Sequence, residues 1–88
     1  MILHLGQETV IKEEDVIGIF DLDSTTVSKK TRSFLTTKQK EGKIVPISEE
    51  LPKSFILAGR KNTREEIVYL SQLSTATLYK RTGMIEFI

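Results

Sequence analysis

The side chains able to do acid–base or metal chemistry are few and isolated along this chain. His4 is the only histidine and there is no cysteine, so no second imidazole and no thiolate can share a metal ion with His4. We expect His4 to be a partly buried side chain of a strand. The lack of cysteine also excludes disulfides and a cysteine nucleophile.

Three short groups could bind an ion, and each has a simpler explanation. Glu13–Asp15 lacks the alternating spacing of a calcium loop and is typical of a polar turn. Asp21 and Asp23 could hold magnesium together, but helix capping explains Asp23 without a metal. Gly59–Lys61 lacks the further glycines of a phosphate-binding loop. Because no nucleophile, base and orienting group can be assembled, we expect no enzyme activity, metal, cofactor or small-molecule substrate.

The remaining side chains with a possible function are the basic ones, which could bind the phosphates of a nucleic acid. Some lie near the start of the first predicted helix, where free backbone N–H groups also favour anions. Others lie on or beside the loops of a predicted hairpin, from which they can reach phosphates without exact spacing. The candidate nucleic-acid-binding residues are Lys53, Lys29, Lys30, Arg32, Arg60, Lys61 and Arg64. The six aromatic residues mostly occupy core-like positions, which disfavours a platform for stacking single-stranded bases.

Six strands are expected to position these residues. Apolar runs and turn formers predict strands at residues 1–5, 9–11, 16–20, 44–47, 54–58 and 67–71. Residues 16–20 are apolar on both alternating faces, so both faces of that strand need cover. Gly18 in its middle predicts a bulge or a close backbone approach, and Pro46 predicts an edge or the end of a strand.

The first predicted helix runs from an N-cap at Ser28 to about Glu41. Its apolar stripe is narrow, because Phe34 and Leu35 are the only large apolar side chains on it. Cations in its last turn suit the helix dipole, and Gly42 is expected to end the helix in a left-handed conformation.

The second predicted helix has the clearest local signature. Ser74 is the expected N-cap, and Leu73 with Leu78 has the spacing of a hydrophobic staple. Gly83 is expected to end this helix. The apolar tail Met84–Ile88 is expected to form a last strand or to pack on another surface.

This order of elements predicts an α+β fold: a small single domain over residues 1–88, a mostly antiparallel sheet and two helices. Two short helices cannot cover all the apolar surface that this fold presents. That surface lies on the strands with two apolar faces, on the edge strand and on the apolar tail. A chain of this length also gains little stability from its own core. We therefore expect a homo-oligomer, for which a closed ring is one arrangement.

Charge is segregated along the chain although the total is only +1, from 13 basic and 12 acidic residues. Residues 1–23 contain one lysine and six carboxylates, whereas residues 29–43 contain six basic side chains and one carboxylate. The net charge of +1 disfavours nucleic-acid binding, because nucleic-acid-binding proteins are usually basic. A charged partner, however, responds to the local electrostatic potential of a surface rather than to the net charge. The acidic and basic faces could also meet each other between subunits.

Composition restricts the setting of the protein. At 39% apolar and 28% charged residues, the chain is too apolar for a disordered protein and too charged for a membrane protein. No apolar run approaches the roughly 20 residues that a membrane helix needs. The absence of cysteine is compatible with a cytoplasmic location.

The order and spacing of several segments resemble the RemA/RemB-like family of bacterial extracellular matrix regulators, closer to its RemB branch. The segments that carry the resemblance are Met1–Gly6, Asp15–Asp21, Phe34-Leu35, Lys43–Pro46, Pro52–Ser54 and Leu73–Arg81. Each segment is weakly specific alone, but their order and spacing together cover nearly the whole chain. The resemblance implies a cytoplasmic regulator of biofilm matrix genes that binds double-stranded DNA. It also implies assembly, since the RemA branch forms closed rings whose repeated basic sites act together.

One departure from the family pattern leaves two alternatives open. Where the RemA branch carries arginines before the strand that begins at Ser54, this chain has Glu49 and Glu50, and only Lys53 keeps the positive charge. The arginine expected before the third strand is also replaced, by the acidic Glu14-Asp15 pair. The alternatives are a DNA-binding oligomer that contacts mainly phosphates, and a ring-forming structural or partner-interaction protein that has lost DNA binding. RNA in place of DNA also remains open.

Overall fold

The chain folds into strands and helices in the predicted order, with one short helix added. The computed structural model describes residues 1–25, 27–59 and 65–82. The elements are β1 (Ile2–Gly6), β2 (Thr9–Lys12), the 3₁₀-helix η1 (Glu13–Asp15), β3 (Val16–Asp21), α1 (Leu22–Thr25), α2 (Lys29–Lys40), β4 (Ile44–Pro46), β5 (Ser54–Gly59), β6 (Glu66–Ser71) and α3 (Thr75–Arg81). The α+β class is confirmed. The predicted number of two α-helices is wrong, because the described residues also form the short helix α1.

The extra helix α1 forms because Asp21 caps it. The Asp21 carboxylate accepts hydrogen bonds from the Ser24 N–H at 3.0 Å and from the Ser24 hydroxyl at 2.8 Å. From the sequence, helix capping was the expected role of Asp23. The cap is Asp21 instead, and Asp23 is exposed.

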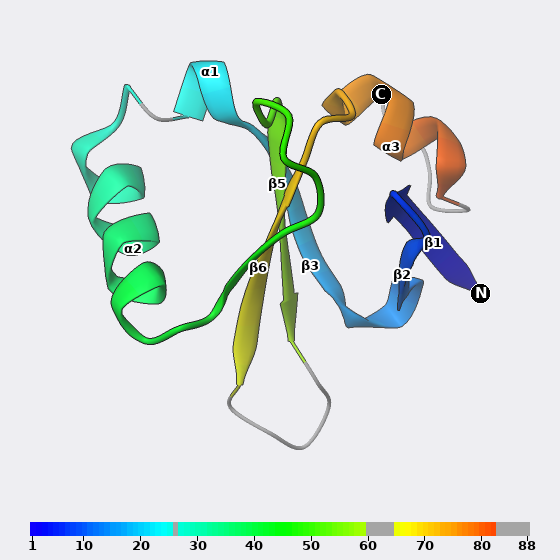
Figure 1. Cartoon of the computed structure of the whole chain (residues 1–88), viewed down its shortest axis with the longest axis horizontal. Helices are drawn as coiled ribbons and strands as arrows, with labels where there is room; N and C mark the ends of the chain where they lie inside the picture. Colours follow the sequence, from blue (N-terminus) through cyan, green and yellow to red (C-terminus); the bar gives the residue numbers. More distant parts are fainter. Residues whose placement is uncertain (26, 60–64, 83–88) are drawn as a thin grey trace.

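The strands form a two-stranded β1–β2 sheet and a four-stranded sheet in the order β3-β5-β6-β4 (Figure 1). β3, β5 and β6 pair antiparallel, and β4 pairs parallel with β6 at one edge. The mostly antiparallel character and the edge position of Pro46 are therefore confirmed. The parallel pairing arises because β4 and β6 both run opposite to β5.

The turn between β1 and β2 uses left-handed backbone at three successive residues. The φ angles of Gly6, Gln7 and Glu8 are 115°, 47° and 66°. This conformation reverses the chain tightly, so that Leu3 pairs with Ile11 across the hairpin.

The predicted bulge at Gly18 is present in β3. The register of β3 against β5 shifts between Val16 and Gly18. An added Cβ at Gly18 would lie 2.6 Å from a ring carbon of Phe20, which stacks on Phe55 with ring centroids 4.8 Å apart. Glycine at this position therefore makes room for an aromatic pair on one face of the sheet.

Both longer helices begin as the sequence predicts. The Ser28 hydroxyl accepts from the Thr31 N–H at 3.4 Å, and the Ser74 hydroxyl accepts from the Thr77 N–H at 3.2 Å. Gly42 follows α2 with φ +73°, the predicted left-handed stop. The helical residues Thr31, Phe34, Leu35 and Lys38 are half-buried and the other residues of α2 are exposed, which confirms the narrow stripe.

The staple of α3 is confirmed, since Leu78 is fully buried and Leu73 packs against the same cluster. α3 is described as far as a C-cap at Thr82. The predicted stop at Gly83 and the tail Met84–Ile88 lie outside the described residues.

The main core lies between one face of the four-stranded sheet and the β1–β2 hairpin with α3. Its buried members are Leu3, Leu5, Ile19, Ile56 and Leu78. The buried hydroxyls of Ser71 and Ser54 donate to the carbonyls of Leu5 and Leu73, each at 2.8 Å. These two bonds fasten the hairpin and the segment before α3 to the sheet.

The chain itself covers both faces of the central strand β5. Phe55 and Ile56 point to opposite faces and are 3% and 0% exposed. α2 lies on the side of the sheet away from the hairpin and contacts β4 (Figure 1). The two-faced strand β3 is covered less completely, because Ile17 remains 57% exposed. Within the described residues, no helix is long and apolar enough to cross a membrane.

Candidate nucleic-acid interface

Lys53 presents an exposed side chain from a backbone that is fixed on both sides. Its N–H donates to the carbonyl of Ser71 at 2.8 Å, at the end of β6. Its carbonyl accepts from the N–H of Leu22 at 3.0 Å, at the start of α1. The ammonium group of Lys53 is therefore carried by a rigid part of the fold while its side chain stays in solvent.

The first turn of α2 is rich in cations. Lys29, Lys30 and Arg32 are all exposed, and this turn contains no carboxylate. The Arg32 guanidinium donates to the carbonyl of Val27 at 3.1 Å, which draws it toward the start of the helix. The helix dipole adds to the positive potential at this end.

The backbone of Lys53 is connected through α1 to the cation-rich first turn of α2. The bond between Lys53 and Leu22 places the start of α1 beside Lys53, and α1 ends four residues before Lys29. In Figure 1, α1 and the start of β5 lie at the upper edge, and α2 begins lower, at the left. We call the group formed by Lys53, Lys29, Lys30 and Arg32 the basic end.

The other predicted cluster, Arg60, Lys61 and Arg64, lies outside the described residues. Its neighbours Gly59 and Glu65 are at the end of the β5–β6 hairpin opposite to Lys53 (Figure 1). Four of the seven predicted cations therefore lie in the described part of the chain, and whether they bind nucleic acid stays a prediction.

Comparison with known proteins identifies the family of this fold. Residues 2–82 match the family model described as extracellular matrix regulatory protein A-like. The chain belongs to the RemA-like family. It is also 35% identical to the extracellular matrix regulatory protein B of Bacillus subtilis (strain 168) over 81 residues, which are 92% of this chain and 89% of that relative. The resemblance inferred from the sequence is thus confirmed.

Two carboxylates lie close in sequence to the basic end of this RemA-like chain. Glu49 and Glu50 are exposed, and the loop that carries them is ordered by a bond from the Glu50 N–H to the Ser48 hydroxyl at 3.0 Å. They precede Lys53 by only three and four residues. Their negative potential opposes an anionic partner at Lys53.

Lys38 contributes to the basic segment of the sequence but not to an exposed basic surface. Its side chain is 12% exposed and its ammonium lies 3.4 Å from a carboxylate oxygen of Glu66 and 3.6 Å from one of Glu41. It also lies 5.7 Å from the ring centroid of Phe34. Lys38 therefore links α2 to β6 through an ion pair. The formal charge of residues 29–43 counts Lys38 as a cation but does not reveal that it is paired.

In the described part of the chain, no group of three or more His, Asp or Glu side chains is placed to hold a metal ion. His4 lies on β1 and is exposed rather than partly buried, so the prediction for its burial is wrong. The reason is that β1 buries Leu3 and Leu5 and turns His4 to the other side.

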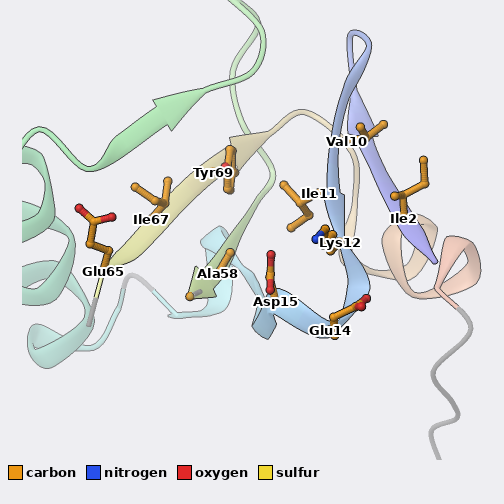
Figure 2. A pocket seen from close by; sticks show the side chains of 11 residues that line it. Ile2, Val10, Ile11, Lys12, Glu14, Asp15, Ala58, Glu65, Ile67 and Tyr69 are labelled. Atoms are coloured by element: carbon orange, nitrogen blue, oxygen red, sulfur yellow. The ribbon is translucent and has the colours of Figure 1, made fainter. Parts of the chain in front are cut away.

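A hollow between the β1–β2 hairpin and the four-stranded sheet is a feature that the sequence did not reveal. It has a volume of about 980 Å³ and is open to solvent (Figure 2). Its lining residues are Ile2, Val10, Ile11, Lys12, Glu14, Asp15, Ala58, Gly59, Glu65, Ile67 and Tyr69. The apolar residues of β1 at both alternating positions were the only signal for it, since Leu3 is buried in the core while Ile2 is left at the hollow.

Proposed function

We propose that this RemA-like protein is a homo-oligomeric, DNA-binding regulator of bacterial extracellular matrix genes that acts in the cytoplasm. Family membership and the name of the Bacillus subtilis relative support the regulatory role. The observation that carries the DNA contact is the basic end, where the hydrogen-bonded backbone of Lys53 is joined through α1 to the cation-rich first turn of α2.

The proposed contact is mainly to phosphate. Lysine and arginine side chains on a fixed backbone can match the regular spacing of phosphates without reading base edges. One chain offers few such contacts and has a total charge of only +1. Several basic ends on one assembly would bind together with a much higher effective concentration, so weak sites suffice.

A titration of fluorescent duplex DNA with the wild-type protein tests this proposal. Each phosphate contact contributes about −0.9 to the slope of log affinity against log salt, so binding at about 50 mM salt should weaken steeply at about 200 mM. Unlabelled RNA duplex of matched length serves as competitor, because RNA offers the same phosphates. An intact oligomer that binds no DNA at about 50 mM salt would contradict the proposal.

The second candidate function is that of a structural or partner-interaction protein without DNA binding. Glu49 and Glu50 favour it, because they lower the potential at the one cation that the family pattern retains. The two functions differ in how the protein responds when these carboxylates are neutralised. A DNA-binding protein should gain affinity, whereas an interaction protein should still bind no DNA.

A further inference from the structure

Helix α2 carries three of the four cations of the basic end but is only lightly packed against the rest of the fold (Figure 1). None of its residues, all of which the structure describes, is fully buried. The half-buried residues form the narrow stripe of Thr31, Phe34, Leu35 and Lys38. Because so narrow a stripe restrains the tilt of a helix weakly, any further contact that fixes α2 also fixes where its cations lie.

Lys38 is the charged side chain of that stripe, and its ammonium reaches from α2 to the sheet. It lies 3.4 Å from a carboxylate oxygen of Glu66 on β6, and 3.6 Å from one of Glu41 just after the helix. The Lys38 side chain is 12% exposed. Because its ammonium is largely shielded from water, solvent cannot fully replace a carboxylate partner that is lost.

Glu66 is a partner that is fixed relative to the sheet. It is the first residue of β6 and pairs with Gly59 of β5. β6 also holds the chain just after α2, since the Val68 N–H donates to the Lys43 carbonyl at 2.9 Å and the Lys43 N–H donates to the Lys38 carbonyl at 2.9 Å. The last turn of α2 is therefore joined to β6 by backbone bonds and by the ion pair together.

The cations of the basic end lie at the other end of α2. At 1.5 Å per residue, Lys29 is roughly 13 Å from Lys38 along the helix axis. A tilt of about 10° around the last turn would move the first turn by roughly 2 Å. The backbone bonds hold the last turn in place, whereas the ion pair lies off the helix axis and restrains this tilt.

We propose that Lys38 is a positioning residue for the nucleic-acid contact. Its ion pair with Glu66 fixes the tilt of α2 and thereby the positions of Lys29, Lys30 and Arg32. Lys38 itself does not contact phosphate, because its ammonium is already paired and shielded. The helix is thus set before DNA binds, so that less ordering is needed on binding. This inference rests on the proposed DNA binding and adds to it a residue outside the basic end.

Glu66→Gln is a test in which charge and positioning predict opposite results. It removes a negative charge, so electrostatics alone predicts stronger DNA binding. Loss of the ion pair frees α2, so the inference predicts binding about threefold weaker at about 50 mM salt in the fluorescence titration. The salt slope should also decrease in magnitude, although no cation has been removed. Glu8→Gln, in the exposed turn of the hairpin, makes the same change in charge away from α2 and should not weaken binding.

The background of Lys38→Met shows whether the two side chains act together. Methionine keeps an apolar stem without the charge, so the ion pair is already absent in this background. Glu66→Gln should then strengthen DNA binding, as charge alone predicts, instead of weakening it. Lys38→Arg keeps a cation at the same position and should bind DNA as the wild type does.

Hydrogen exchange without DNA measures how firmly α2 is held. In Glu66→Gln the amides of α2 should exchange about threefold faster, while those of β5 stay unchanged. Unchanged exchange in α2, or stronger DNA binding by Glu66→Gln than by the wild type, would overturn the inference while leaving the DNA binding of the wild type in place. A wild type that binds no DNA would overturn the proposed function, and this inference with it, whatever the exchange rates.

Discussion

The carbonyl of Lys53 accepts a hydrogen bond from the N–H of Leu22 at 3.0 Å. This bond joins the residue before β5 to the first residue of α1, although 31 positions separate them in the sequence. It holds the backbone of Lys53 beside the helix that leads into the cation-rich turn of α2. The basic end is thus produced by tertiary structure.

Reversing the charge of Lys53 should weaken DNA binding without altering the assembly. Lys53→Glu removes a cation that binds phosphate from every subunit, so the affinity should fall at least tenfold. The magnitude of the salt slope should drop by about 1 for each phosphate that is no longer bound. Lys40→Glu, in the exposed last turn of α2, makes the same change in total charge away from the basic end and is the control. Equal decreases in affinity for both variants would show that only total charge matters.

Neutralising the two loop carboxylates should strengthen DNA binding. Glu49→Gln with Glu50→Gln removes two negative charges within four residues of Lys53, and the affinity at about 50 mM salt should rise several-fold. The gain should shrink at higher salt because the interaction between exposed charges is screened. The same fluorescence titration measures the affinity. An unchanged affinity would show that these carboxylates do not lie near the DNA-binding surface and would contradict the prediction.

Ser71→Ala should destabilise the fold, because the buried Ser71 hydroxyl satisfies two backbone groups. It donates to the Leu5 carbonyl at 2.8 Å and accepts from the Leu73 N–H at 3.0 Å. Leaving these groups unpaired costs about 1–3 kcal/mol, which urea unfolding can measure. Ser33→Ala on the exposed face of α2 should change stability by less than about 0.5 kcal/mol.

Gly18→Ala should destabilise the fold through the ring of Phe20. The added methyl would lie 2.6 Å from a ring carbon, so the aromatic pair with Phe55 must shift at a cost of about 1–3 kcal/mol. In a background of Phe20→Leu the same substitution should cost clearly less. Unfolding of the four chains gives a double-mutant cycle, and additive effects would mean that the ring is not the obstacle.

Local features of this fold could be predicted from the sequence with good accuracy. The caps at Ser28 and Ser74 and the left-handed Gly42 depend on the chemistry of a few adjacent residues, and all three are present. The bulge at Gly18 was predictable for the same reason, because a glycine inside an apolar run is a local signal.

Relationships between distant residues could not be predicted in the same way. The parallel pairing of β4 with β6, the ion pair between Lys38 and Glu66, and the hollow beside the hairpin all depend on how elements pack. The sequence predicted Asp23 as the cap, whereas Asp21 caps α1. Both carboxylates are close enough in sequence to cap this helix, and the residue at which β3 ends decides which of them does so.

The central claim is that an assembly of this chain binds duplex DNA through its basic ends. Sedimentation of a fluorescent duplex in the presence of the protein tests the assembly and the binding together. At about 50 mM salt the label should move with several protein chains, and at about 200 mM most of it should return to the position of free DNA. A label that sediments as free DNA at the lower salt, while the protein itself sediments as an oligomer, would contradict the account.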